Sequence, residues 1–476
     1  MMHCSVGLLS VVFPTLLGWS LVRVFDRRQV LSEAEHLSLG GALGIGFLAW
    51  WMLLLDWFSI PFTRSNLVIP MAIASIPVML GRFRSNRSTV NPSRVRRTDA
   101  VLLAVIAVQL LTTTVFSLLR PIEVHDAVFN WGLKSKAIFL GRAVPMRLLE
   151  TNVSPNPTYP LLMPLAQSYV SLFLGEYDDF CAKWICVLLF MSFLGFLYFA
   201  LRRTGASLRT GLFAVLVVCT IPQVVEQVSN GYADLPVGIY FGLAGICFCL
   251  WLREESHLFM VLAALFSAFA ALTKDEGLAA AVLLFCCFVT AMLARRKGSI
   301  AHALTGIVGF VAIFGVLLLP WLRLKIHLEL AAQAYLVRRP FPRFEWGRLE
   351  RLWPIFYQYQ LQWFSLRSWN LLWVFILVAL AVGYKRSLRG ERAWIGSLLL
   401  GQLMIYTMFY ILVPDENHPV MNLPWYLMTT VSRMLLQLTP LSVFFLASLL
   451  ASLESRGRLA GAGPIAGHTL QNVHEP

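Results

Sequence analysis

Residues 101–140 read VLLAVIAVQLLTTTVFSLLRPIEVHDAVFNWGLKSKAIFL, and this stretch decides how the rest of the chain is interpreted. Its first half, Val101–Leu119, is apolar and long enough to cross a lipid bilayer, which takes about 20 residues. Its second half places Glu123, His125 and Asp126 where the chain leaves the membrane. Ionisable groups are costly at this depth, so their presence here indicates a functional site.

The residues after Asp126 have the pattern of a short helix lying on the membrane surface. Lys134 and Lys136 are expected to extend toward water or lipid phosphate. The apolar side chains expected to face lipid are Val128, Phe129, Trp131 and Leu133. An acid fixed beside such a basic helix suits chemistry on a lipid-borne substrate. The alternative is structural, with Asp126 capping the N-terminus of the helix that follows it.

The composition is that of a polytopic membrane protein. Of the 476 residues, 58% are hydrophobic and 13% are charged, and the mean hydropathy is +0.69. A soluble domain would carry about 25% charged residues. The net charge is +14, but the basic residues lie mostly between apolar runs, which is typical of cytoplasmic loops and not of nucleic-acid binding. The eight cysteines form no CxxC pair and lie in or beside apolar runs, so we interpret them as core residues.

The apolar runs predict an all-α, polytopic transmembrane helical bundle of about 13 spans. The first run lacks the basic flank of a signal peptide, so we expect it to be retained as a span. The expected spans are Ser5–Leu21, Leu37–Ile60, Leu67–Leu80, Ala100–Leu119, Cys181–Leu201, Gly211–Val225, Leu235–Leu252, Leu258–Leu272, Leu278–Ala294, Ala301–Trp321, Asn370–Val382, Trp394–Leu412 and Met434–Leu450.

The loop charges predict which side of the membrane each loop occupies. Arginine and lysine follow every second span, so these loops are assigned to the cytoplasm, with the N-terminus outside and the C-terminus inside. Tyr159–Leu174 is apolar enough to be one more span, which would invert every later loop. It is short and carries Pro160 and Pro164 in its first turns, so we interpret it as a second interfacial or re-entrant helix. The stretch Arg120–Asp179 then lies entirely outside.

Acidic residues from three places are expected on this outer side of the membrane. Asp126 follows one span, Asp234 lies in NGYADLP before another, and Asp275 and Glu276 follow Lys274 in the turn TKDEG. The alternative is that these are turn and cap residues, since an acid before Leu-Pro is an ordinary helix start. The basic outer stretch of residues 323–367, which includes Arg338 and Arg339, is a candidate site for an anionic lipid headgroup.

Several motifs resemble the C-type (GT-C) superfamily of membrane glycosyltransferases, and most closely the family of protein O-mannosyltransferases and lipid A aminoarabinose transferases. HDAVFNWGLKSKAIFLG resembles the first outer loop of that family, with Asp126 at the position of the catalytic acid. YADLP resembles its second acidic motif, LTKDEG its lysine turn, and SRMLLQLTP, with Arg433, a C-terminal segment of bacterial members. The second juxtamembrane helix is matched by NPTYPLLMP, followed by Gly175, Asp179 and Lys183.

Three features depart from the family pattern. His125-Asp126 replaces a pair of acids, Asp275-Glu276 replaces Gly-Pro, and four spans precede the first outer loop where the family has one. The resulting division has N-terminal transmembrane helices (1–99), a GT-C-like catalytic transmembrane module (100–322) with the outer loop 120–180, a C-terminal transmembrane region (323–455) and a disordered cytoplasmic tail (456–476).

The resemblance implies an inverting glycosyltransferase at the outer face of a bacterial inner membrane. The donor would be a sugar on a polyprenyl phosphate, and the acceptor a hydroxyl on a glycan, lipid or protein. Asp126 would be the general base, and Lys274 with Arg433, Arg338 or Arg339 would bind the departing phosphate. The candidate substrate-binding residues are Glu123, His125, Trp131, Lys134, Tyr159, Asp234, Asp275 and Glu276.

The same resemblance requires no cofactor. Asp234 would orient the acceptor or help to hold a divalent cation, although the sequence shows no His/Cys/Asp cluster at metal-ligand spacing. Trp131 and Tyr159 would bound a groove for the isoprenoid, and the alternative for each is an ordinary aromatic belt. Three other functions remain open: a transporter or flippase, a polysaccharide polymerase or ligase, and a structural membrane subunit.

Overall fold

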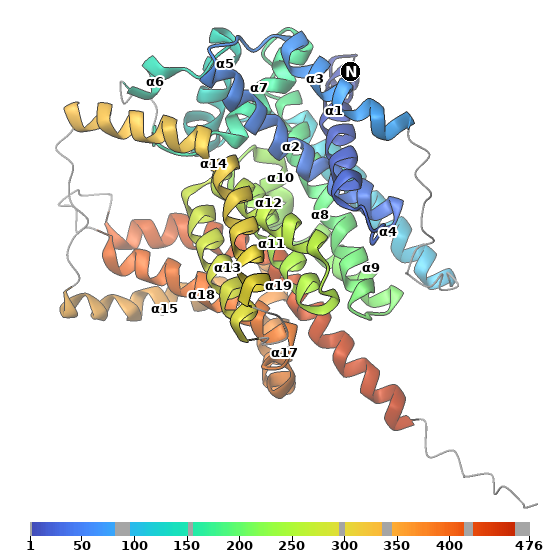
Figure 1. Cartoon of the computed structure of the whole chain (residues 1–476). Helices are drawn as coiled ribbons and strands as arrows, with labels where there is room; N and C mark the ends of the chain where they lie inside the picture. The colour runs from blue at the N-terminus through green and yellow to red at the C-terminus, as the bar shows by residue number, and fades with distance from the viewer. Residues whose placement is uncertain are drawn as a thin grey trace, which may run out of the picture.

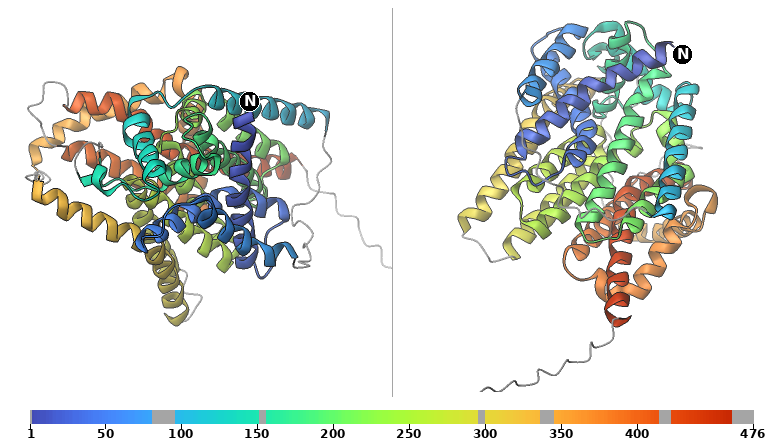
Figure 2. Two further views of the ribbon diagram at one scale, coloured as in Figure 1. Left: turned by 90° about the horizontal axis from the view of Figure 1, so that it is seen from above. Right: turned by 90° about the vertical axis from the view of Figure 1, so that its right-hand side faces the viewer.

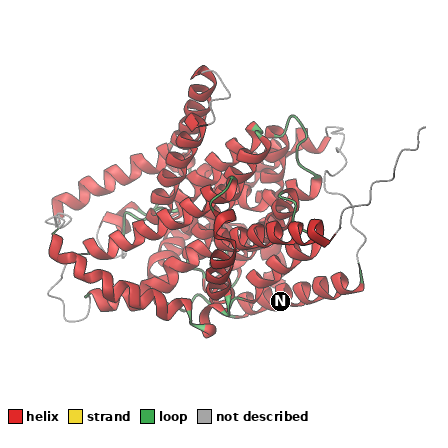
Figure 3. Cartoon of the chain, turned by 90° about the horizontal axis from the view of Figure 1, so that it is seen from below, coloured by secondary structure: helices red, strands yellow, loops and turns green. Residues whose placement is uncertain are grey.

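The computed structural model describes residues 2–80, 96–150, 156–294, 300–335, 345–413 and 422–461, and the regular elements of these ranges are all helical (Figures 1 and 3). Within them, nine helices are long and apolar enough to cross a membrane, or ten if one bent pair counts as a span. The chain therefore fits an integral membrane protein. The nine are α1 (Met2–Phe25), α2 (Glu33–Trp57), α4 (Arg97–Leu119), α8 (Trp184–Arg203), α11 (Asp234–Glu254), α13 (Asp275–Ala294), α14 (Ile300–Tyr335), α18 (Glu391–Leu412) and α19 (Leu423–Gly461).

Four of the expected spans are not among these nine helices. The expected count of about 13 therefore depends on whether these four also cross the membrane. Three form helices that are short for a span: α3 (Arg64–Leu80) and α12 (His257–Thr273) have 17 residues each, and α17 (Leu372–Ser387) has 16. The fourth is broken into α9 (Leu208–Thr220) and α10 (Pro222–Asn230), which are bent by 62°. Pro222 explains the break, because proline cannot donate the backbone hydrogen bond that would continue α9.

The loop between α4 and α8 is folded. It contains the π-helix η1 (Ala127–Gly132), α5 (Leu133–Gly141), α6 (Met146–Glu150), α7 (Leu162–Leu174) and the short turn η2 (Cys181–Lys183). With 13 residues, α7 is too short to cross a bilayer, and it ends at Gly175, whose φ of 92° suits glycine. Residues 162–172 are buried, so α7 packs inside the protein against α1, α2 and α5, and its interfacial or re-entrant placement stays a prediction.

The N-terminal helices pack directly against the rest of the bundle (Figure 2). α2 packs against α1, α8 and α12, and glycine makes this close approach possible. A Cβ atom on Gly44 would lie 1.7 Å from the Pro14 carbonyl oxygen of α1, so no other residue fits there. The Tyr240 hydroxyl of α11 donates a hydrogen bond to the Ala42 carbonyl at 2.9 Å. The expected N-terminal and catalytic modules therefore share one packed interior.

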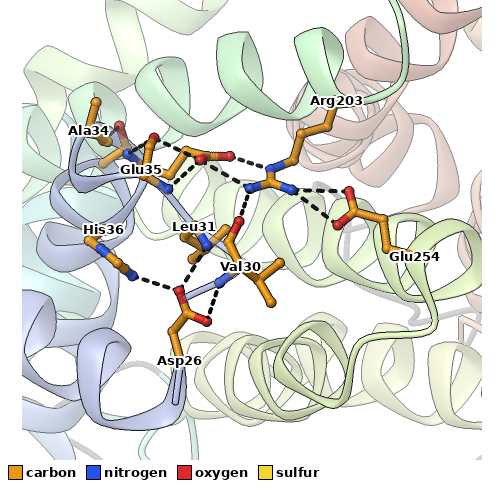
Figure 4. Close-up of polar contacts among 10 residues, drawn as sticks. Asp26, Val30, Leu31, Ala34, Glu35, His36, Arg203 and Glu254 are labelled. Atoms are coloured by element: carbon orange, nitrogen blue, oxygen red, sulfur yellow. Dashed lines mark hydrogen bonds and ion pairs between the residues drawn. The ribbon is translucent and has the colours of Figure 1, made fainter. Parts of the chain in front are cut away.

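A buried cluster of charges joins the α1–α2 turn to the C-terminal ends of α8 and α11 (Figure 4). Arg203 donates to Glu35 and, at 3.1 and 3.2 Å, to the two carboxylate oxygens of Glu254. Asp26 accepts from His36 Nε2 at 3.0 Å and from two backbone N–H groups at 2.7 and 2.8 Å. Because these carboxylates already have their partners, the cluster is a structural link between the N-terminal hairpin and the rest of the bundle.

The polar contacts sort the helix ends into two groups at opposite ends of the bundle. α11 has 21 residues and is about 30 Å long at 1.5 Å per residue, with Asp234 at its start and Glu254 at its end. Asp234 contacts groups from α12 and α19, whereas Glu254 belongs to the Arg203 cluster. The two groups coincide with the loops assigned to the outer and cytoplasmic sides, and the membrane side that each group faces stays a prediction.

The C-terminal part contains η3 (Trp346–Arg351), α15 (Leu352–Trp363), α16 (Leu366–Trp369), α17, α18 and α19. α19 projects beyond the bundle at its C-terminal end (Figure 1). Disorder was expected from residue 456 onward, but the helix continues to Gly461, so residues 456–461 are helical. The remainder of that expected tail lies outside the described residues.

Candidate functional site

Three segments that are far apart in the sequence meet through one guanidinium group. Arg433 of α19 donates from Nη1 to Asp126 Oδ2 at 2.5 Å and from Nε to Asp234 Oδ2 at 2.9 Å. Asp126 immediately precedes η1, and Asp234 lies in the first turn of α11. The guanidinium also lies over the ring of Tyr232, 4.8 Å from its centre. These contacts place two expected acids and one expected cation in a single cluster.

Lys274 completes the cluster from the end of α12. Its Nζ donates to Asp234 Oδ1 and to Glu276 Oε1, both at 2.8 Å. The backbone of Lys274 is extended, with φ −159° and ψ 155°, so the chain leaves α12 here before α13 begins at Asp275. We call Asp126, Asp234, Lys274, Glu276 and Arg433 the acid–cation cluster.

Burial divides the members of the acid–cation cluster into two kinds. Asp234 is fully buried and Lys274 is 5% exposed, so both are shielded from solvent. The side chain of Asp126 is 33% exposed, and its Oδ1 lies 3.5 Å from Nδ1 of the exposed His125. Of the two aspartates, only Asp126 is therefore accessible to solvent, and Arg433 holds its Oδ2 and not its Oδ1.

Neither aspartate acts as a helix cap. Asp126 makes no side-chain capping hydrogen bond at the start of η1. The N-cap of α11 is Ala233, and the Asp234 carboxylate is used by Arg433, Lys274 and Gln437 instead. The cap interpretation that the sequence left open for these two residues is therefore wrong.

Two further polar residues in the site were missed by the sequence analysis. Gln437 Nε2 donates to Asp234 Oδ1 at 2.8 Å, and the Tyr406 hydroxyl donates to Gln437 Oε1 at 2.6 Å. Gln437 lies four residues after Arg433, which puts both side chains on the same face of α19. That spacing of two polar residues inside an apolar helix was the available signal. Tyr406 has the same kind of signal, because Gln402 and Tyr410 lie four residues before and after it on one face of α18.

The helix after Asp126 differs from the surface helix that was expected. Its first turn is a π-helix, in which Leu133 N–H donates to the Val128 carbonyl five residues earlier. This bonding pattern turns residues five apart toward the same side, so Asp126 and Trp131 both face the protein. Trp131 is 1% exposed and Lys134 is fully buried, so the expectation that they face lipid and water is wrong. Phe129 and Lys136 are exposed as expected.

Lys134 has an unusual setting for a lysine. Its Nζ donates to the Asn156 carbonyl at 2.7 Å and lies 5.8 and 5.9 Å from the ring centres of Trp131 and Tyr159. Those two rings stack with centres 5.9 Å apart. Burial lowers the pKa of Lys134 to about 8, and the charge of Asp275 acts in the opposite direction. Lys134 therefore anchors the turn that carries Tyr159.

Tyr159 connects this packing to the acid–cation cluster. Burial raises the pKa of its hydroxyl to about 12, and the charges of Lys274, Glu276 and Asp234 also act on it. The hydroxyl therefore stays protonated at neutral pH and lies within electrostatic reach of the cluster.

The remaining candidates lie outside the acid–cation cluster. Glu123 forms an exposed ion pair with Arg120, and His125 is exposed and packs on the Phe129 ring at 4.7 Å between centres. Asp275 pairs with Lys325 of α14 at 2.8 Å. Arg338 and Arg339, which were expected near a phosphate, lie outside the described residues.

The charges and geometry of the described part of the chain give no metal site. It contains no group of three or more His, Cys, Asp or Glu side chains placed to hold a metal ion.

In the acid–cation cluster, three carboxylates face two cations, which leaves one net negative charge. Both cations are already bonded to carboxylates.

Comparisons with protein-family models, with curated protein sequences and with solved structures give no match to this chain. The site is therefore interpreted from its own geometry.

Proposed function

We propose that this protein is a membrane glycosyltransferase. It moves a sugar from a polyprenyl-phosphate donor to a hydroxyl on a glycan, lipid or protein, with inversion, at the outer face of a bacterial inner membrane. The observation that carries the proposal is the pairing of Asp126 with Arg433, which holds one carboxylate oxygen of a side chain that is 33% exposed. An oriented and accessible carboxylate at the end of a membrane span is what a general base for a lipid-linked substrate requires.

In this mechanism Asp126 Oδ1 accepts the proton of the acceptor hydroxyl. The resulting oxygen attacks the anomeric carbon on the side opposite the phosphate, and a bond from that oxygen to the carbon forms. The bond between the carbon and the phosphate oxygen breaks, and the phosphate leaves with its electron pair. A single protein carboxylate is sufficient because the phosphate needs no proton to leave.

The departing phosphate needs a cation, and Arg433 is the better placed of the two. Each cation is held by two carboxylates, but the Arg433 side chain is 19% exposed, against 6% for Lys274. A guanidinium can also bond a phosphate while it keeps a carboxylate, since it carries five N–H donors. Lys274, expected to bind the donor, serves in this proposal to fix Asp234.

The proposed topology has about 13 spans and includes the short helices. α12 begins near the end of α11 that carries Glu254 and ends at Lys274, which bonds Asp234 at the other end of α11. It must therefore run the length of α11 despite having only 17 residues. A cysteine in place of Asp178 should react with an impermeant reagent from outside the cell. Labelling from the cytoplasm would contradict this topology.

The function is tested by sugar transfer from a radiolabelled polyprenyl-phosphate sugar in membranes that contain the full chain. Asp126→Asn should lower transfer about 100-fold or more, the usual contribution of a general base, without changing the amount of protein in the membrane. Glu226→Gln, which changes an exposed acid on α10, is the matched control and should keep full transfer. Near-normal turnover by Asp126→Asn would exclude this residue as the base, and no transfer by the unaltered chain would exclude the function.

A further inference from the structure

A cavity of about 250 Å³ lies beside η1 and is separate from the acid–cation cluster. Its apolar wall comes from Ile122, Val128, Phe129 and Leu133, and its polar groups include Lys136 and Asp179. Trp131 and Lys134, which face the protein, do not line it. The same short helix therefore presents one face to the cluster and another to this cavity.

The cavity is bordered by the ends of two candidate membrane spans. Ile122 follows closely after Leu119, where the span α4 ends, and Asp179 comes just before Cys181, where the next span begins. α4 is largely uncovered by protein, with Leu119 72% exposed and Phe116 41% exposed. A cavity bordered by the ends of two spans and next to such a helix is open to lipid from the side.

The two charged residues of the cavity are not neutralised by each other. In the described ranges, no ion pair within 4.0 Å joins Lys136 to Asp179, and neither pairs with another charged residue. Lys136 Nζ lies 5.5 Å from the centre of the Tyr177 ring. Burial, the charge of Asp179 and a hydrogen bond between its carboxylate and the Tyr177 hydroxyl raise the pKa of Tyr177, and the same hydroxyl lies 3.1 Å from the Gly132 carbonyl oxygen. The cavity thus combines one cation and one carboxylate with an apolar wall.

We propose that this cavity binds the headgroup of a phosphatidylethanolamine lipid. The Lys136 ammonium contacts the lipid phosphate, and the Asp179 carboxylate accepts hydrogen bonds from the primary ammonium of the ethanolamine. Ile122, Val128 and Phe129 contact the glycerol and the first methylenes of the acyl chains.

The charges favour this headgroup over the other common ones. A choline headgroup has a quaternary ammonium, which cannot donate a hydrogen bond to Asp179. A glycerol headgroup leaves the lipid with a net negative charge and gives Asp179 no cation to pair with. The inference does not depend on the proposed transfer reaction, although a bound lipid would brace the helix that follows Asp126.

The test measures lipid retained by the full chain after transfer into nanodiscs of phosphatidylglycerol that contain equal small amounts of phosphatidylethanolamine and phosphatidylcholine. Native mass spectrometry should find ethanolamine lipid bound in preference to choline lipid. Asp179→Asn should reduce this preference about tenfold, since one charge-assisted contact is lost. Lys136→Gln should reduce retention of both lipids.

Lys385→Gln is the matched control, because Lys385 is also exposed and lies 5.9 Å from the centre of a tyrosine ring, but near the end of α11 that carries Glu254. It should retain ethanolamine lipid as the unaltered chain does. Each variant must elute as a single folded species. Equal retention by the unaltered chain, Lys136→Gln and Asp179→Asn would overturn the proposal, and so would a preference for choline or glycerol lipid.

Discussion

Arg433 Nη1 lies 2.5 Å from Asp126 Oδ2, although 307 positions separate the two residues in the chain. This contact joins α19 to the segment that follows α4, at one end of the bundle. The Nε of the same guanidinium holds Asp234. One side chain therefore sets the distance between a partly exposed carboxylate and a buried one.

Arg433→Lys should disrupt this arrangement even though it keeps the positive charge. A lysine has a single nitrogen and no planar fork, so it cannot reproduce the contacts that Nη1 and Nε make with Asp126 and Asp234. We expect the thermal midpoint in detergent to fall and sugar transfer to be lost. Arg348→Lys, which changes an arginine of η3 away from the acid–cation cluster, is the comparison. Full transfer by Arg433→Lys would show that the fork geometry does not matter.

Substitution of Asp234 should lower the stability of the protein much more than substitution of Asp126. Asp234→Asn removes the charge that neutralises Lys274 and Arg433 in a fully buried position, which should cost about 3–5 kcal/mol of unfolding free energy. Asp126→Asn changes a carboxylate that is one-third exposed, so its stability cost should be about 1 kcal/mol or less. Thermal unfolding of both variants in one detergent measures the difference. Equal losses would mean that the burial of Asp234 contributes nothing.

Lys134 should make the stability depend on pH. Burial lowers its pKa from 10.5 to about 8, so between these values the unfolded chain holds a proton that the folded chain has released. Stability therefore rises as the pH increases through this window, and the cost of burying the ammonium is fully present below pH 8. The rise is about 3 kcal/mol at most, since one pKa unit corresponds to about 1.4 kcal/mol. Lys134→Met should lose this rise, as unfolding at pH 7.5 and pH 10 would measure. Parallel pH profiles would contradict it.

The sequence was informative where a local pattern decides the outcome. Apolar length and loop charge predicted the helices and the grouping of their ends, because both follow from the cost of placing polar groups in lipid. They also pointed to Asp126, Asp234 and Lys274, which lie at helix ends within the same group. Arg433 was named only through the motif that contains it.

The sequence was not informative where packing decides. A π-helical turn has no simple sequence signal, so the inward direction of Trp131 and Lys134 was missed. The bond from Gln437 to Asp234 and the bond from Tyr406 to Gln437 could not be assigned either, since they depend on the crossing of α11, α18 and α19. Such crossings depend on which helices pack together, and hydropathy does not encode that choice.

The charge cluster of Figure 4 gives a last prediction, about the N-terminal hairpin. Arg203→Ala leaves the Glu35 carboxylate, whose side chain is 1% exposed, without its cation, and the α1–α2 turn loses its contact with α8. We expect a loss of about 3–5 kcal/mol in unfolding free energy. Arg253→Ala is the matched control, because its ion pair with Glu391 is exposed and should contribute about 1 kcal/mol or less. If both variants unfold at the same temperature, the hairpin is held by its glycine packing and the charges are dispensable.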